Sequence, residues 1–226
     1  MAAKGIVAWT SSHLDDIGQA SVEHLRLVGI SIAVATVIAL PVAVLVRRRR
    51  IATAIANGAG TFLYNIPSFA LFALLVPLVG IGDTPAIIAL VIFAVGIILR
   101  NAVAGLDAVA PHDLEAARGM GMTRSQILRR VELPRALPAI ITGIRLASVS
   151  NVAIATIGAF IGSGGLGTVI LHDGVQRDLY IPPIVAGFVC AAGIAVAIDL
   201  TLLGLQRWGT PWMRTGTPHV RAGAAQ

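Results

Sequence analysis

The residues best able to form a catalytic triad are Ser163, His172 and Asp173, which lie close together in the sequence. An intramembrane serine protease of the rhomboid type needs Gly-x-Ser-Gly, but the residue two before Ser163 is Ile161. His172 and Asp173 also fall outside the apolar segments described below, where a base is solvated and is not held against a buried nucleophile. We therefore predict no catalytic residue among them.

ATP binding and metal binding are the other chemistries to consider. A phosphate-binding loop needs Gly-x-x-x-x-Gly-Lys-Ser/Thr, but the only lysine, Lys4, is followed by Gly5 and Ile6. The single cysteine, Cys190, stands in an apolar run, so neither a disulfide framework nor a cysteine metal site is expected. We expect no cofactor and no metal in this chain, and any use of ATP by means of a phosphate-binding loop would fall to a partner.

The composition is too apolar for a soluble globule. Of the 226 residues, 56% are hydrophobic and 12% are charged, whereas soluble domains carry about 25% charged residues. The predicted fold is an all-α integral membrane domain over residues 23–205, with an external segment over 1–22 and a disordered cytoplasmic tail over 206–226. Because a spanning helix needs roughly 20 apolar residues, five spans are predicted, over residues 23–46, 51–79, 84–105, 138–161 and 182–205.

The second predicted span is long and contains Pro67. Residues 51–79 would cover only about 44 Å at 1.5 Å per residue, which is too short for two spans and a turn. Proline removes a backbone donor and bends a helix. The sequence therefore predicts one kinked helix here.

The arginines predict the orientation. Residues 47–50 are four consecutive arginines after the first span, and cytoplasmic loops carry an excess of Lys and Arg. With five spans, fourteen basic residues share that side, against Lys4, Arg26 and Arg177 on the other. We expect an external N-terminus and a cytoplasmic C-terminus. Orientation also explains the net charge of +6, and no aromatic residues interleave the arginines as single-stranded nucleic-acid binding would require.

Polar residues within the spans suggest a route for a solute, since such groups are costly in a membrane. Their alternative role is interhelical hydrogen bonding, and the sequence does not decide between the two. A second ambiguity concerns Asp199, an acid inside the last span, which is either paired in the packing or a proton carrier of a secondary transporter. The candidate pathway residues are Asn65, Ser68, Asn101, Ser148 and Asn151.

The loop over residues 106–137 is too polar to cross a bilayer and too long for a plain connection. Asp113 is a candidate N-cap for a first short helix that Gly119 and Gly121 end. A second short helix is predicted from Thr123 until Pro134 stops it. The product would be a helix–glycine turn–helix projection on the cytoplasmic face.

This loop resembles the signature of binding-protein-dependent ABC importer permeases: Glu-Ala-Ala, three residues, Gly, nine residues, an aliphatic residue, any residue and Leu-Pro. The resemblance implies a multi-pass protein of the bacterial inner (cytoplasmic) membrane with a type I, methionine-permease-like fold. Its loop would be a coupling helix in a groove of a cytoplasmic ATPase dimer. The resemblance further implies that ATP and magnesium bind to that ATPase, that an extracytoplasmic binding protein delivers the solute, and that a second permease, identical or a sibling, completes the pathway. The coupling residues so implied are Glu115, Ala116, Ala117, Gly119, Gly121, Val131, Leu133 and Pro134.

Several short motifs resemble the osmoprotectant branch, which handles glycine betaine, choline, carnitine and related quaternary amines. The run Gly164–Gly167 also occurs in methionine-type permeases, so another small solute such as an amino acid is the alternative. Only 11 aromatic residues occur, and no aromatic cage for a quaternary ammonium is evident in the spans. High-affinity selection is therefore assigned to the binding protein. The motifs are Ile66–Ser68, Gly80–Gly82, Arg100–Asn101, Gly119–Met122 and Gly162–Gly167.

Overall fold

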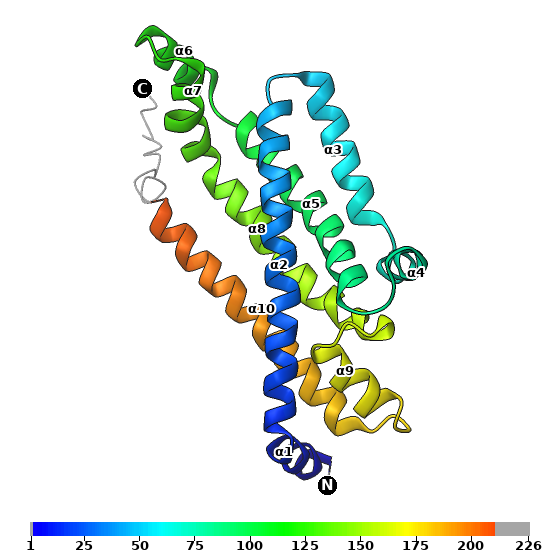
Figure 1. Cartoon of the computed structure of the whole chain (residues 1–226). Helices are drawn as coiled ribbons and strands as arrows, with labels where there is room; N and C mark the ends of the chain where they lie inside the picture. Colours follow the sequence, from blue (N-terminus) through cyan, green and yellow to red (C-terminus); the bar gives the residue numbers. More distant parts are fainter. Residues whose placement is uncertain (1, 211–226) are drawn as a thin grey trace, which may run out of the picture.

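The structure is a computed structural model that describes residues 2–210, and over these residues every regular element is helical. Figure 1 shows an elongated bundle of steeply inclined helices. Four helices are long and apolar enough to span a membrane, and the total is five if a bent helix pair forms one span. The all-α membrane fold is therefore confirmed. The spanning elements are α2 (Leu14–Val46), the pair α3 (Arg50–Asn65) and α4 (Ser68–Val79), α5 (Asp83–Asp107), the continuous helix Arg124–Ile161 that contains α8 (Leu133–Ile157), and α10 (Ile181–Gly209).

The boundaries at the two chain ends differ from those predicted. The first spanning helix begins at Leu14, and a separate helix, α1 (Ala2–Ser12), precedes it. Residues 14–22 of the predicted external segment 1–22 are thus continuous with the helix of the first span. The last helix continues to Gly209, four residues into the predicted tail. The expected disorder of residues 211–226 lies outside the described residues.

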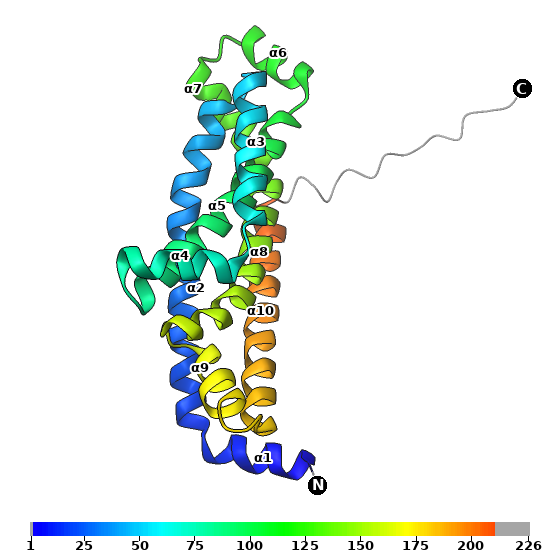
Figure 2. The same cartoon turned by 90° about the vertical axis from the view of Figure 1, so that its right-hand side faces the viewer.

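The second span is not one kinked helix, so that prediction was wrong. Helices α3 and α4 meet at an angle of 89°, and Figure 2 shows α4 lying across the other helices. Ile66 and Pro67 both have extended backbone angles, with ψ of 130° and 119°. The ring of a proline disfavours the helical conformation of the preceding residue, so the helix stops at Asn65 and restarts at Ser68. Leu71 and Phe72 of α4 are buried against Phe93 of α5, which fixes the new direction.

The centre of the bundle is α5, which packs against α2, α3 and α8. Small residues form these contacts: Ala35 and Ala39 of α2 and Ala94 of α5 have no exposed surface. At Gly96, an added Cβ would lie 2.5 Å from the carbonyl oxygen of Gly60, so only glycine allows α3 to approach this closely. Within lipid, close packing of small residues is a main source of helix association.

The two ends of the bundle differ in composition. The α2–α3 junction with its four arginines and the loop helices α6 (Pro111–Gly119) and α7 (Arg124–Ile127) lie toward one end, which we call the Arg-rich end. Helix α1 and the segment around α9 (Leu166–Ile170) lie at the opposite end (Figure 1). This separation is what the predicted orientation requires, and the orientation itself stays a prediction.

We expect a reporter domain fused after Gln226 to lie in the cytoplasm. We expect a reporter domain inserted near Gly174 to lie on the opposite side of the membrane. Gly174 lies in the π-helical turn Leu171–Val175 at the opposite end, beside the exposed residues 175–180. Paired fusions of alkaline phosphatase and green fluorescent protein measure both positions. Activity of both fusions on the same side of the membrane would contradict a five-span topology.

Candidate functional site

The first helix of the projecting loop, α6, begins three residues earlier than predicted. Its N-cap is Ala110 and Pro111 occupies the first turn, where the missing N–H of proline has no partner to lose. Asp113 is therefore not the N-cap. Its Oδ1 instead accepts a hydrogen bond of 2.9 Å from Nη2 of Arg135, which ties the first turn of α6 to the start of α8.

The turn after α6 depends on Gly121. The N–H of Met122 donates to Ala117 O at 3.1 Å and the N–H of Gly121 donates to Arg118 O at 2.9 Å, which is the Schellman pattern of a helix end. Gly121 has φ +75°, a left-handed conformation that L side chains rarely adopt. Gly119 lies in the helix with open space around it, so the turn depends on only one of the two predicted glycines.

Thr123 begins the second loop helix, as predicted. Its Oγ1 accepts from Gln126 N at 3.3 Å, and Gln126 Oε1 accepts from Thr123 N at 2.7 Å, forming a capping box. Pro134 does not stop this helix, so that prediction was wrong. The turn Leu128–Glu132 is π-helical, and the N–H of Leu133 donates to Leu128 O, five residues earlier. The absent N–H of Pro134 therefore falls where the backbone has already left the α-helical hydrogen-bond pattern. The loop helix thereby runs directly into α8.

The signature residues divide into an exposed and an inner set. Glu115, Ala116 and Gly119 are exposed on α6. Ala117 is buried, with 1% of its surface accessible. Val131, Leu133 and Pro134 are half-buried where the loop joins the bundle. The loop thus presents a free helical face while its base is packed.

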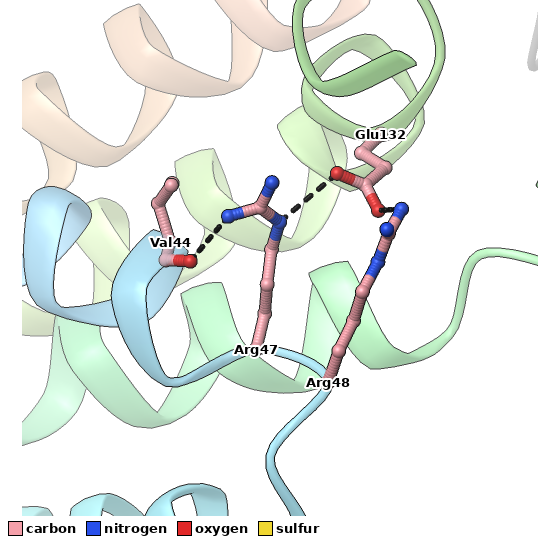
Figure 3. Close-up of polar contacts among 4 residues, drawn as sticks. All are labelled: Val44, Arg47, Arg48 and Glu132. Carbon is pink, nitrogen blue, oxygen red and sulfur yellow. Dashed lines mark hydrogen bonds and ion pairs between the residues drawn. The ribbon is translucent and has the colours of Figure 1, made fainter. Parts of the chain in front are cut away.

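A buried carboxylate joins this base to the first span. Glu132 is 2% exposed, and its Oε2 accepts from Nε of Arg47 at 3.0 Å. Its Oε1 accepts from Nη2 of Arg48, and Arg47 also donates to the carbonyl of Val44 (Figure 3). Sequence reasoning missed Glu132 because it occupies the unrestricted position before Leu-Pro. The sequence did contain one signal for it. Glu132 is an acid between the apolar residues Val131 and Leu133, and the four consecutive arginines elsewhere in the chain are possible ion-pair partners.

A cavity of about 370 Å³ opens between α3, α5 and α8. Arg100 and Asn101 contribute charge and an amide to it, and Tyr64 contributes an aromatic ring. Within residues 2–210, Arg100 forms no ion pair, although it lies inside a spanning helix. An unpaired intramembrane charge generally faces a water-filled space or a functional partner. The remaining lining residues are Gly60, Thr61, Gly96, Ile97, Ala104, Leu146 and Ser150.

Of the five predicted pathway residues, only Asn101 lines this cavity. Ser148 and Asn151 do share one face of α8, but that face is turned into the core, where they are 3% and 0% exposed. The Asn151 amide donates to Leu90 O of α5 at 3.0 Å, and the Ser148 hydroxyl donates to Ile144 O at 2.8 Å. The Asn151 bond is interhelical and so matches the alternative, whereas the Ser148 bond lies within α8. A pathway role for these two residues stays a prediction.

The other two pathway candidates lie at the α3–α4 break. Asn65 is exposed at the end of α3, and its amide donates to Thr61 O at 2.7 Å. Ser68 is half-buried at the first position of α4. Neither belongs to the cavity, so a pathway role for them stays a prediction.

The acid in the last span is paired. Asp199 of α10 accepts from Nε and Nη2 of Arg145 of α8, each at 2.9 Å, and Arg145 also donates to Gln206. This bidentate pair accounts for Asp199 as a packing element, so it no longer favours a proton-coupled transporter. The triad candidate Ser163 is buried, and its hydroxyl has no hydrogen-bond partner within the described residues, so His172 does not activate it.

The apolar bundle and its projecting helical loop are the architecture that the resemblance to importer permeases predicts. Residues 31–215 match the family described as the binding-protein-dependent transport system inner membrane component. The chain belongs to this family. The predicted resemblance to binding-protein-dependent ABC importer permeases is thereby confirmed, and so is the inner-membrane location.

Individual relatives indicate which kinds of permease the chain is similar to. The chain is 40% identical over 194 residues to the osmoprotectant import permease protein OsmW of Salmonella typhimurium, covering 84% of this chain and 89% of the relative. It is 36% identical over 190 residues to the choline transport system permease protein OpuBB of Bacillus subtilis, covering 84% and 86%. Among solved structures, an inward-facing MetNI methionine ABC transporter has a TM-score of 0.74 at 27% identity, covering 86% of this chain and 96% of that one.

Proposed function

We propose that this chain conducts a quaternary-ammonium osmoprotectant, such as glycine betaine, carnitine or choline, across the membrane as the permease of an ATP-driven importer. Relatives named for osmoprotectant and choline transport, at 36–40% identity over most of their length, support the class of solute. The structural observation that carries the proposal is the cavity between α3, α5 and α8, together with Arg100, which has no ion pair among residues 2–210.

The cavity carries two kinds of group that suit a zwitterionic solute. The guanidinium of Arg100 and the amide of Asn101 can bind a carboxylate, and the ring face of Tyr64 can attract a quaternary ammonium group. All three residues line the same cavity. One aromatic ring is far less than a cage, so we propose weak binding during passage and assign strong selection to an extracytoplasmic binding protein.

The rest of the assembly is proposed around this path. A second permease, identical or a sibling, would close the face formed by α3, α5 and α8 and enclose the cavity. The exposed face of α6, with Glu115, Ala116 and Gly119, would dock in a groove of a cytoplasmic ATPase dimer that binds ATP and magnesium. We propose that the chain itself contributes no catalytic group and no cofactor site, and that movement of the loop opens the path alternately to the two sides.

Reconstituted with its ATPase and binding protein, the importer is expected to take up glycine betaine, carnitine or choline and not methionine. Arg100→Gln is expected to reduce uptake of glycine betaine or carnitine by about 10- to 100-fold, since a charged hydrogen bond is worth roughly 1.5–3 kcal/mol. Choline has no carboxylate, so its uptake should change little. Radiolabelled uptake into proteoliposomes measures each solute.

The control for this experiment is Arg129→Gln, which removes the same charge from an exposed loop position outside the cavity. Methionine uptake with no uptake of any quaternary amine would overturn the proposed solute class. Equal loss of choline and glycine betaine uptake in Arg100→Gln would show that Arg100 does not bind the carboxylate.

A further inference from the structure

A second cavity lies at the Arg-rich end, between the end of α2 and the projecting loop. Its volume is about 670 Å³. Residues from the α2–α3 junction form one wall, and residues from α6 to α7 form the other. We call it the arginine cavity; it is lined by Arg47, Arg48, Arg49, Arg118 and Arg124 together with Val44, Leu45, Met122 and Ile127.

The arginine cavity carries more positive charge than the protein neutralises. Glu132 pairs with Arg47 and Arg48, as Figure 3 shows, so a single carboxylate already serves two guanidinium groups. Over residues 2–210, no ion pair reaches Arg49, Arg118 or Arg124. Residues 211–226 contain no Asp or Glu side chain. Because like charges lining one cavity repel each other, an external anion would stabilise this arrangement.

The lining also indicates which kind of anion fits. Guanidinium groups bind phosphate oxygens through paired hydrogen bonds. Val44 and Leu45 belong to the last turn of the apolar helix α2, and Leu45 is 73% exposed. With the predicted orientation, a cavity at this place would meet both the headgroup layer and the adjoining hydrocarbon. A free inorganic anion would satisfy the arginines only, whereas a phospholipid would cover the apolar side chains as well.

We propose that the arginine cavity binds the phosphodiester headgroup of an anionic phospholipid. Basic pockets between spanning helices near the membrane surface are suited to such headgroups. The lipid phosphate would contact Arg49 from the α2–α3 junction and Arg118 and Arg124 from the loop. It would therefore bridge the first span and the loop beside the Glu132 ion pairs, and hold the loop against the bundle. This proposal is independent of the solute that the protein carries.

The test uses the complete importer with its ATPase, since a carboxylate of that partner is the competing occupant. Native mass spectrometry and thermal unfolding are measured with added phosphatidylglycerol, phosphatidylcholine or inorganic phosphate. Phosphatidylglycerol should be retained and should raise the unfolding temperature, and the other two should not. Arg49→Gln/Arg124→Gln should bind phosphatidylglycerol roughly 30-fold more weakly, since each arginine near a membrane surface contributes about a fivefold factor.

The matched control is Arg129→Gln/Arg130→Gln, which removes the same charge from exposed loop positions outside the cavity. It should bind the lipid like the unaltered protein. An equal loss in the control would mean diffuse attraction to the surface and would overturn the site. Equal stabilisation by inorganic phosphate, or retention of phosphatidylglycerol only after the ATPase is removed, would also overturn it. The lipid comparison on the unaltered importer is decisive even if the double variant folds poorly.

Discussion

Replacing Gly121 with proline is expected to abolish transport while the spanning helices still insert. Proline fixes φ near −65°, whereas Gly121 has φ +75° and donates its N–H to Arg118 O. The Schellman turn would open, and α6 with its exposed Glu115 would point elsewhere. Local backbone strain costs roughly 1–3 kcal/mol, and it would act on the loop without reaching the buried core. Solute uptake into proteoliposomes and co-purification of the ATPase measure the effect.

Three further variants distinguish an effect of the turn at Gly121 from an effect of the exposed face of α6 that this turn positions. Gly119→Ala should transport normally, because Gly119 is helical and nothing lies within 4 Å of an added Cβ. Gly121→Ala should be intermediate, since a left-handed alanine costs roughly 1 kcal/mol. Glu115→Arg should weaken ATPase binding with the backbone unchanged. Full transport by both Gly121→Pro and Glu115→Arg would show that the loop does not couple the two subunits.

The second large effect is expected at Glu132. Glu132→Gln removes the carboxylate that pairs with Arg47 and Arg48. Breaking a buried ion pair costs about 3–5 kcal/mol, and we expect about 2–3 kcal/mol because the Arg48 side chain is 39% exposed and partly screened. The unfolding temperature should fall by roughly 5–10 °C. Fluorescence-detected unfolding of the purified protein measures it.

Two variants test whether the ion pairs cause this loss. Glu115→Gln removes an exposed carboxylate that has no ion pair among the described residues, and it should leave the unfolding temperature unchanged. The double variant Arg47→Gln/Glu132→Gln should be more stable than Glu132→Gln alone. It removes the Arg47 charge that the single variant leaves without its carboxylate partner. An unchanged unfolding temperature in Glu132→Gln would mean that these ion pairs do not hold the loop to the first span.

Features set by neighbouring residues could be predicted from the sequence. A spanning helix depends on a continuous apolar run, and residues 84–105 were predicted within two residues of α5. The loop turn depends on a glycine that tolerates positive φ, and the second loop helix depends on the pairing of Thr123 with Gln126, three residues away. These preferences act over one or two turns of chain, so they do not depend on the surrounding structure.

The tertiary structure decided which of several locally allowed outcomes occurs. Pro67 permits a kink or a complete break, and burial of Phe72 against α5 selects the 89° bend. Helix α8 has polar residues on more than one face, and packing against α5 turns Asn151 inward and leaves Ser150 at the cavity. Glu132 and Arg47 are 85 residues apart, so only the docking of the loop beside α2 pairs them. In each case the deciding free energy comes from contacts between helices distant in sequence, which local preferences do not contain.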